Sequence, residues 1–228
     1  MIVAISQRNI KVEKRANRDI LENDYVQYYE GFGLTLMPIP NASRGVYKYF
    51  DNIKINGIIL TGGGDVNQAL YRKIPKNKEN LGPRDNTEKK LIEIALKKHL
   101  PLLANCRGAQ FTNVFFGGSL VQNLKGKTGF NHVGKIHKVS IIDDKAVNFY
   151  KKNSFKVNSY HNHGIDKNTL SKKLKPFAIS EDGIIEGFYH PKHPIAGVLW
   201  HPERKGSDKG ADRKLIKAFI HRRFFWNK

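Results

Sequence analysis

The sequence of 228 residues predicts an α/β fold, with a mostly parallel central sheet flanked by helices and an antiparallel portion in its second half. In the first half, short apolar segments alternate with segments of helical periodicity. One apolar segment, at residues 57–60, contains no polar side chain, as expected for a strand buried on both faces. In the second half, strand-like segments follow one another without long helices between them. No repeat or linker is found, so we expect one domain over residues 1–228.

The first half of the chain is expected to alternate between strands and helices. Four apolar segments are read as strands, at residues 2–6, 33–39, 57–60 and 101–104. A polar, charged loop is expected over residues 7–23, and a helix with Asp24 as its N-cap follows it. Asn86 or Thr87 is expected to cap a second helix. A third helix of about ten residues follows Cys106 and ends at Gly117-Gly118.

The second half is expected to be mainly β-structure closed by one helix. Five further strands are predicted, at residues 135–142, 155–158, 177–180, 184–189 and 195–200. Glu181-Asp182-Gly183 is typical of a hairpin turn between two of them. Residues 211–224 have the pattern of a basic amphipathic helix, and its apolar face favours docking on the sheet.

The net charge is strongly positive. Forty Lys and Arg residues against twenty Asp and Glu residues give a formal charge of +20, which favours an anionic partner or substrate. Nucleic acid is disfavoured, because the basic residues are spread along the chain and no nucleic-acid-binding signature is found. A basic solvated surface explains the composition equally well. A basic binding module that merely retains the fold stays a non-enzymatic hypothesis.

The sequence also disfavours several classes of protein. The single cysteine, Cys106, excludes an intramolecular disulfide and a multi-cysteine zinc site. No stretch approaches the ~18 uncharged apolar residues of a membrane span. The apolar start at residues 1–6 lacks the basic region and the long apolar region of a signal peptide. We therefore expect a cytoplasmic protein without membrane association, and the sequence leaves open whether it forms a homo-oligomer.

Cys106 lies where a buried strand meets a helix. The predicted strand ends directly before it, the helix begins near Arg107, and Gly108 follows. Such a turn lifts a nucleophile out of the sheet, towards the backbone N–H of the next residue and the positive end of the helix dipole. The same field, with a basic neighbour such as Arg107, favours thiolate over thiol. A lone cysteine is usually a small buried hydrophobic residue, but this context favours a catalytic one.

His201-Pro202-Glu203 supplies a base and a carboxylate directly after an apolar strand. Residues two apart in an extended segment project to the same side, so the carboxylate of Glu203 can reach the imidazole of His201. A thiolate needs such a base, and the base needs an orienting acceptor. Taken alone, a surface pair would be the better interpretation. Because the chain also contains the cysteine turn, we favour a catalytic role for His201 and Glu203.

Thr61-Gly62-Gly63-Gly64 follows another buried strand and offers unobstructed backbone N–H groups to a developing oxyanion. A glycine triplet alone is equally typical of a flexible turn. Its position favours the functional interpretation. The triplet and Cys106 both follow the carboxyl ends of predicted parallel strands, where open α/β sheets bind their ligands.

Five ordered segments together resemble the class I glutamine amidotransferase-like family, and more closely its γ-glutamyl hydrolase branch, which includes γ-glutamyl-γ-aminobutyrate hydrolases. The segments are residues 60–67 with Leu70-Tyr71, Arg84-Asp85 with Glu88, residues 106–110 with Asn113 and Gly117-Gly118, residues 158–161, and residues 200–203. The resemblance spans nearly the entire chain. It implies a flavodoxin-like central sheet and a cysteine-dependent hydrolase.

The resemblance also implies roles for individual residues. It assigns catalysis to Cys106, His201 and Glu203, and the oxyanion hole to Gly63, Gly64 and Arg107. It further implies that five residues hold the α-amino and α-carboxylate groups of a glutamyl substrate: Gln110, Asn158, Ser159, Tyr160 and His161. No cofactor is implied. His161 and His163 resemble a metal pair, but no third ligand is evident from the sequence, so no metal is expected.

Two residues depart from the family pattern. Ala104 replaces the glycine usually found two residues before the nucleophile, so the turn must accommodate an extra methyl group. The polar Asn105 directly precedes the nucleophile, and the sequence gives no reason for it. These departures put the geometry of the turn in doubt more than the activity, because neither removes a catalytic group.

The sequence thus predicts a hydrolase that cleaves a γ-glutamyl amide through a glutamyl thioester to give glutamate and a free amine. The alternative is a glutaminase subunit that supplies ammonia to a separate synthase. The segment from Gly62 to Tyr71 favours the hydrolase, and no synthase domain is present in the chain.

The positive charge favours an anionic leaving group, such as the nucleotide phosphoramidate that one member of the family releases for surface-polysaccharide decoration. Five basic residues of the segment 7–23 are candidates for phosphate contact, although a solvated loop is an equally good interpretation: Arg8, Lys11, Lys14, Arg15 and Arg18.

Overall fold

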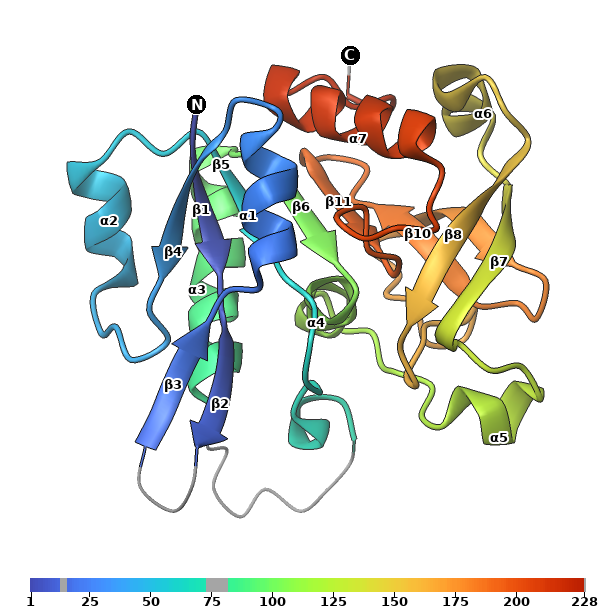
Figure 1. The fold of residues 1–228 in the computed structure, drawn as a ribbon, viewed down its shortest axis with the longest axis horizontal. Helices are drawn as coiled ribbons and strands as arrows, with labels where there is room; N and C mark the ends of the chain where they lie inside the picture. Colours follow the sequence, from blue (N-terminus) through green and yellow to red (C-terminus); the bar gives the residue numbers. More distant parts are fainter. Residues whose placement is uncertain (13–15, 73–81, 228) are drawn as a thin grey trace.

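The structure, a computed structural model, describes residues 1–12, 16–72 and 82–227. Within these ranges one sheet of nine strands has the order β4-β1-β5-β6-β11-β10-β9-β7-β8 (Figure 1). One half of this sheet is parallel: β4 (Thr35–Ile39), β1 (Ile2–Ser6), β5 (Gly57–Leu60), β6 (Leu102–Asn105) and β11 (Ile195–Val198). The other half is antiparallel: β10 (Ile185–Tyr189), β9 (Lys175–Ser180), β7 (Val133–Ile141) and β8 (Ser154–Tyr160). The predicted α/β fold class is confirmed.

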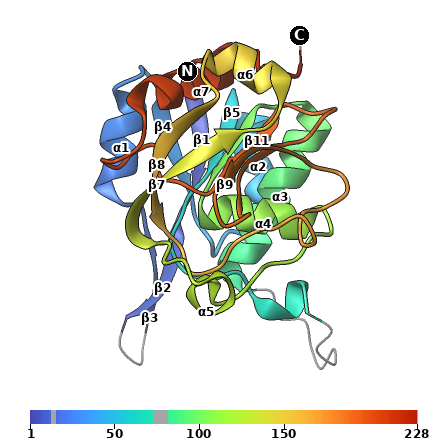
Figure 2. The ribbon, with the colours of Figure 1, turned by 90° about the vertical axis from the view of Figure 1, so that its right-hand side faces the viewer.

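Helices cover both faces of the sheet, which gives three layers (Figure 2). One face packs against α2 (Val46–Asn52), α3 (Pro83–Lys98) and α4 (Arg107–Phe115). The opposite face packs against α1 (Asn23–Glu30), α6 (Asp144–Tyr150) and α7 (Lys209–His221). The short helix α5 (Leu124–Thr128) lies below the antiparallel half in Figure 1.

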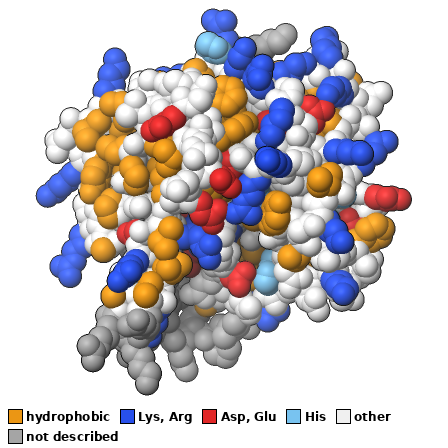
Figure 3. Space-filling view, viewed as in Figure 1, with side chains coloured by type: hydrophobic (Ala, Val, Ile, Leu, Met, Phe, Trp, Pro, Cys, Tyr) orange, Lys and Arg blue, Asp and Glu red, His pale blue; other side chains and the backbone are white. Residues whose placement is uncertain are grey.

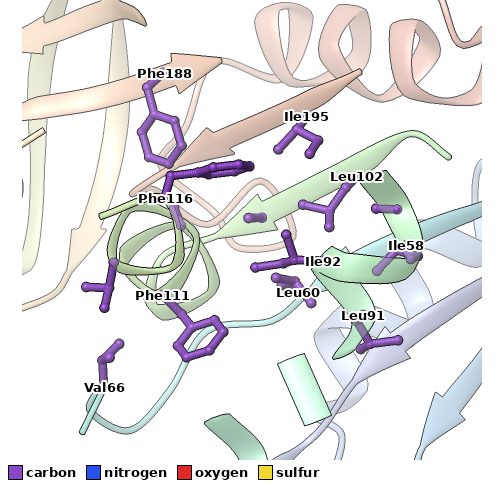
Figure 4. Packing of buried hydrophobic residues seen from close by; sticks show 14 of the residues in the cluster. Ile58, Leu60, Val66, Leu91, Ile92, Leu102, Phe111, Phe116, Phe188 and Ile195 are labelled. Atoms are coloured by element: carbon purple, nitrogen blue, oxygen red, sulfur yellow. The ribbon is translucent and has the colours of Figure 1, made fainter. Parts of the chain in front are cut away.

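The apolar segments form two cores because successive strand residues point to opposite faces. In β5, Ile58 and Leu60 join the core under α3 and α4, whereas Ile59 joins the core under α1 and α7. Figure 4 shows the first core, where Leu91 and Ile92 of α3 approach Ile58 and Leu60. Burial on both faces explains why these strands contain almost no polar residues.

In its described part, the segment predicted as a loop over residues 7–23 is a β-hairpin. Strands β2 (Arg8–Val12) and β3 (Ala16–Ile20) pair antiparallel, with Arg8 opposite Ile20. The loop prediction was wrong because charged residues on both strands conceal the alternation of apolar positions. The hairpin extends beyond the lower end of the sheet in Figure 1.

Several helix boundaries differ from those predicted. The N-cap of α1 is Glu22, so Asp24 lies inside the first turn, where a carboxylate suits the helix dipole. Helix α3 begins at Pro83, before Asn86 and Thr87, because proline is preset for the first helical position. Helices α2, α5 and α6 were not predicted. The remaining predicted strands and helices are present with shifts at their ends.

The surface agrees with the composition. Figure 3 shows Lys and Arg side chains spread over the visible face and not gathered in one patch. Among the described residues, no helix combines the length and apolar character needed to cross a membrane.

Candidate active site

Cys106 occupies a strained turn between β6 and α4. Its backbone has φ 49° and ψ −109°, a conformation that costs a non-glycine residue free energy and that clusters at functional sites. Its N–H donates to the carbonyl of Val198 in β11 at 2.7 Å, which fixes the turn to the neighbouring strand. Gly108 is required two residues later, since a Cβ there would lie 2.7 Å from Leu60. The predicted turn is therefore present, with the side chain 5% exposed.

His201 follows β11 and is oriented by Glu203. Its Nδ1 lies 2.5 Å from Oε1 of Glu203, and the Glu203 side chain is inaccessible to solvent. This contact occupies Nδ1 and leaves Nε2 for another partner. The side chain of His201 also interacts with that of Cys106. The structure thus brings together the three side chains that the sequence singled out for catalysis.

The environment of His201 favours its charged form. Burial opposes protonation, but the Cys106 side chain and the Glu203 carboxylate outweigh it and raise the pKa of His201 to about 10. An imidazolium next to Cys106 stabilises the thiolate, the reactive form of cysteine. The pair therefore places a proton donor, His201, beside the cysteine sulfur.

Asn158 holds the backbone of His201 in place. Its Oδ1 accepts from the His201 N–H and its Nδ2 donates to the His201 carbonyl, both at 2.8 Å. Because Asn158 belongs to β8 and His201 follows β11, these bonds connect distant strands of the sheet. The Asn158 side chain is buried and does not line the cavity described below.

The glycine loop after β5, Gly62 to Gly64, lies against the side chains of Cys106 and His201. A Cβ at Gly62 would lie 2.6 Å from Cε1 of His201 and 3.3 Å from Cβ of Cys106, so only glycine fits there. The Gly62 N–H already donates to the Tyr25 hydroxyl at 2.7 Å. Gly63 and Gly64 have φ 81° and 75°, the left-handed region in which glycine is unstrained. Since the Gly62 N–H is occupied, Gly63 and Gly64 are the better candidates to hold an oxyanion.

Arg84 fixes this loop from behind, a role that the sequence did not reveal. Its guanidinium donates to the carbonyls of Thr61, Gly62 and Gly63 at 2.7, 3.1 and 2.6 Å. Such a fork of donors suits several acceptors at once.

A buried ion network continues from Arg84 to the nucleophile turn. Glu88 accepts from Arg84 at 2.9 Å and pairs with Arg107, which also pairs with Asp85. Desolvation opposes charge on Glu88, but Arg107 and Arg84 outweigh it and hold the pKa of Glu88 below its usual range. The network links the loop at Gly63 to the first residue of α4, so both sides of the predicted oxyanion hole are held by one cluster.

Asn105 and Ala104 fit the turn without disturbing it. The Asn105 side chain is buried and donates to the Tyr29 hydroxyl at 2.7 Å. This bond explains a polar residue directly before the nucleophile. Ala104 is fully buried in β6, where it pairs with Leu60 of β5 and Gly197 of β11.

A cavity of about 420 Å³ opens over Cys106 and His201. Its walls include three of the five residues expected to bind a glutamyl group, Gln110, Tyr160 and His161. The side chains of Asn158 and Ser159 lie elsewhere. Ser159 is fully buried and donates to the carbonyl of His132 at 2.6 Å. In this structure the side chains of Asn158 and Ser159 are hydrogen-bonded to backbone groups of the protein. They are therefore not free to contact a substrate in the cavity.

The basic residues of the β2–β3 hairpin differ in their position relative to the cavity. Arg8 lines the cavity and its stem lies against Gly63, whereas Lys11 and Arg18 do not belong to the cavity wall. Lys14 and Arg15 lie outside the described residues. Arg204, directly after Glu203, also lines the cavity and stacks over the Tyr160 ring at 4.8 Å.

Residues 1–203 match the Peptidase C26 family, and the chain belongs to this family. It is 39% identical over 181 residues to a protein of Schizosaccharomyces pombe provisionally named a glutamine amidotransferase, with 74% of this chain and 70% of that one covered. It is 31% identical over 207 residues to the γ-glutamyl-CDP-amidate hydrolase of Campylobacter jejuni, with 90% and 91% covered.

Solved structures show the same fold. A Thermoplasma acidophilum protein, provisionally described as part of a GMP synthase, superposes with a TM-score of 0.69 at 21% identity, covering 98% of this chain and 96% of that one. The resemblance to the class I glutamine amidotransferase-like family is thereby confirmed.

Proposed function

We propose that this chain is a cysteine-dependent hydrolase of γ-glutamyl amides, with Cys106 as nucleophile, His201 as its base and Glu203 orienting that base. The observation that carries the proposal is the convergence of a strained Cys106 and a buried, Glu203-bound His201 around Gly62. Membership of the Peptidase C26 family and the likeness to a γ-glutamyl-CDP-amidate hydrolase support an amide hydrolase.

In the first half of the reaction, the Cys106 thiolate attacks the γ-carbonyl carbon and a C–S bond forms. The carbonyl electrons move to oxygen, where the N–H groups of Gly63 and Arg107 stabilise the oxyanion. When the C–N bond breaks, His201 gives its proton to the leaving nitrogen. The products of this half are a free amine and a glutamyl thioester on Cys106.

In the second half, neutral His201 takes a proton from water and the hydroxide attacks the thioester carbon. The C–S bond breaks and returns the electron pair to Cys106. Glutamate leaves, and the thiolate and imidazolium are restored. Glu203 keeps Nδ1 of His201 as the donor throughout, so that Nε2 exchanges the proton.

The walls of the cavity favour an anionic leaving group. Arg8 and Arg204 approach the two oxygens of one carboxylate, Glu22, at 3.2 and 2.6 Å. Both arginines are partly exposed, with side-chain accessibilities of 40% and 25%. One carboxylate between two guanidinium groups leaves a positive charge facing the cavity. Asp65 also lies on the wall, but its side chain is 81% exposed and water screens it.

The test measures kcat/KM for three γ-glutamyl amides at low and high salt: a nucleotide phosphoramidate, a neutral amide and a polyamine conjugate. We expect the anionic substrate to be preferred and the preference to shrink as salt rises. Arg8→Gln should lower kcat/KM for that substrate by about tenfold, the effect of ~1.4 kcal/mol. Lys11→Gln, on the same hairpin, is the matched control and should change little. Equal turnover of the polyamine conjugate would reject the anionic leaving group but not amide hydrolysis.

Adding glutamine to this panel tests the alternative glutaminase function. A chain that releases glutamate from glutamine and from none of the other amides would be a glutaminase, and the hydrolase proposal would fail.

A further inference from the structure

A second group of ionisable side chains lies beside the cavity and has no part in the proposed reaction. His132, His137 and Glu186 place ligand atoms within 4.8 Å of one another. His161, which lines the cavity, also approaches Glu186. The four residues come from the antiparallel half: His132 precedes β7, His137 lies in β7, His161 follows β8 and Glu186 lies in β10. The fold therefore supplies the ligands that His161 lacked in the sequence.

The spacing of these atoms fits a metal ion. Oε1 of Glu186 is 3.5 Å from Nδ1 of His132, 3.3 Å from Nε2 of His137 and 3.5 Å from Nε2 of His161. Zinc bonds of about 2.0–2.1 Å in tetrahedral geometry separate neighbouring ligand atoms by roughly 3.3–3.4 Å. The three distances from Glu186 therefore approximate edges of such a tetrahedron, and the ligand atoms of His132, His137 and Glu186 all lie within 4.8 Å of one another.

The outer contacts orient two of the histidines towards the shared centre. Nε2 of His132 lies 3.0 Å from the Asp182 carboxylate, and Nδ1 of His161 lies 3.0 Å from the carbonyl of His163. Histidines that bind metals usually donate their other N–H to such an acceptor, which turns a lone pair to the ion. The Ser159 hydroxyl donates to the His132 carbonyl and lies 3.4 Å from Nδ1 of His132, so the binding of an ion at Nδ1 replaces this weak contact.

Three of the four side chains have ligand atoms that satisfy no hydrogen-bond geometry among the described residues. Glu186 is fully buried and neither of its carboxylate oxygens has a hydrogen-bond partner among the described residues. Nε2 of His137 and Nε2 of His161 are likewise buried without one. A buried carboxylate needs a compensating positive charge, which either a protonated imidazole or a metal ion among these four side chains supplies.

From this geometry we infer that His132, His137, His161 and Glu186 bind one divalent transition-metal ion of the zinc type. Three imidazoles and one carboxylate are ligands that suit Zn²⁺. The ion would connect β7, β10 and the segment after β8. It would thereby hold the cavity wall at His161, and it is not needed as a reactant in the proposed hydrolysis.

The first measurement is metal content. Protein without a histidine tag is treated with chelator, reconstituted with Zn²⁺, desalted and analysed for zinc by mass spectrometry. We expect about one zinc ion per chain, a higher melting temperature with Zn²⁺, and a tetrahedral cobalt spectrum after Co²⁺ replacement. Zinc below about one tenth per chain, with no shift in melting temperature, would overturn the inference.

Variants locate the site. His137→Asn and Glu186→Gln should abolish stoichiometric binding, and Asp182→Asn, behind His132, should weaken it by about 10–100-fold. The His137 side chain is 22% exposed, so His137→Asn carries the test if the buried Glu186→Gln variant fails to fold. His193→Gln is the control, because His193 packs against His99 and His190 in another histidine group. Unchanged binding by His137→Asn, or loss in His193→Gln, would place the metal elsewhere and reject the site. None of these readouts depends on hydrolysis, so failure here leaves the proposed function untouched.

Discussion

The two halves of the sheet carry their polar residues in different ways. In the parallel half, Cys106 and the glycine loop directly follow strands whose carboxyl ends meet at one edge, and each is read from one short segment. In the antiparallel half, His132 precedes β7, His137 lies in β7 and Glu186 lies in β10, and they meet only because both strands pair with β9. In the parallel half, polar residues come together because they follow neighbouring strands at the same edge of the sheet. In the antiparallel half, polar residues within the strands can come together across the sheet.

The largest expected effect is in the parallel half. Cys106→Ala should lower glutamate release at least ~1,000-fold, because no covalent intermediate can form. The small change in volume should leave circular dichroism and the zinc content unchanged. If the variant kept a tenth of wild-type activity, Cys106 would not be the nucleophile.

Arg84→Lys should have the next largest effect. The substitution keeps the charge in the network but loses the fork that reaches three loop carbonyls. We expect kcat to fall by about 10–100-fold with a smaller change in KM, since the proposed role of the loop is to stabilise the oxyanion and not the ground state. Lys89→Met, at an exposed pair on the same helix, is the control. An unchanged kcat would mean that the loop backbone needs no support.

Asn158→Ala tests the connection between the halves. The variant removes the two bonds that hold the His201 backbone, so kcat should fall by about tenfold through misorientation of the base. A loss confined to KM would instead favour direct contact of Asn158 with substrate, as the family resemblance implies. Steady-state kinetics with one γ-glutamyl amide separates the two outcomes.

The pKa of His201 predicts a change in stability with pH. Its pKa is raised from 6.5 to about 10 in the folded state, so the charged form stabilises the fold fully below pH 6.5. That contribution is lost as pH rises towards 10. We expect the free energy of unfolding, measured by urea denaturation, to decline across this interval. The decline should be smaller in Cys106→Ala, which lacks the side chain that helps to raise the pKa of His201. Equal declines would assign the effect to other groups.

Ala104→Gly should have the smallest effect. It restores the residue usual in the family, and the turn at Cys106 already forms with Ala104 in place, so kcat should change less than about twofold. Loss of the buried methyl group and greater backbone freedom should destabilise the fold by about 1 kcal/mol. A large gain in activity would show that the methyl group strains the turn.

The sequence predicted the parallel half well because its strands are continuous apolar segments followed by polar turns. It located Cys106, His201 and the glycine loop from single segments. It could not predict the role of Arg84, whose three acceptors approach only after folding. The hairpin β2–β3 was missed because Arg8, Lys11 and Arg18 interrupt its apolar pattern.

The histidine group was missed for a related reason. His132 and Glu186 are far apart in the chain, and no local spacing connects them. His161 and His163 drew attention because they are close in sequence, yet His163 contributes only its carbonyl to His161. Nearness in sequence was therefore a poor guide in this half.

Strand β11 has a further consequence for synthesis of the chain. It lies between β6 and β10 in the sheet, but its residues, Ile195–Val198, are synthesised after those of every other strand in the sheet. Until they emerge, a nascent chain presents two open strand edges at the future centre of the sheet, and such edges pair readily with other chains. His201 arrives just after them. Protection from premature association and completion of the candidate active site are thus expected in the same brief interval of translation.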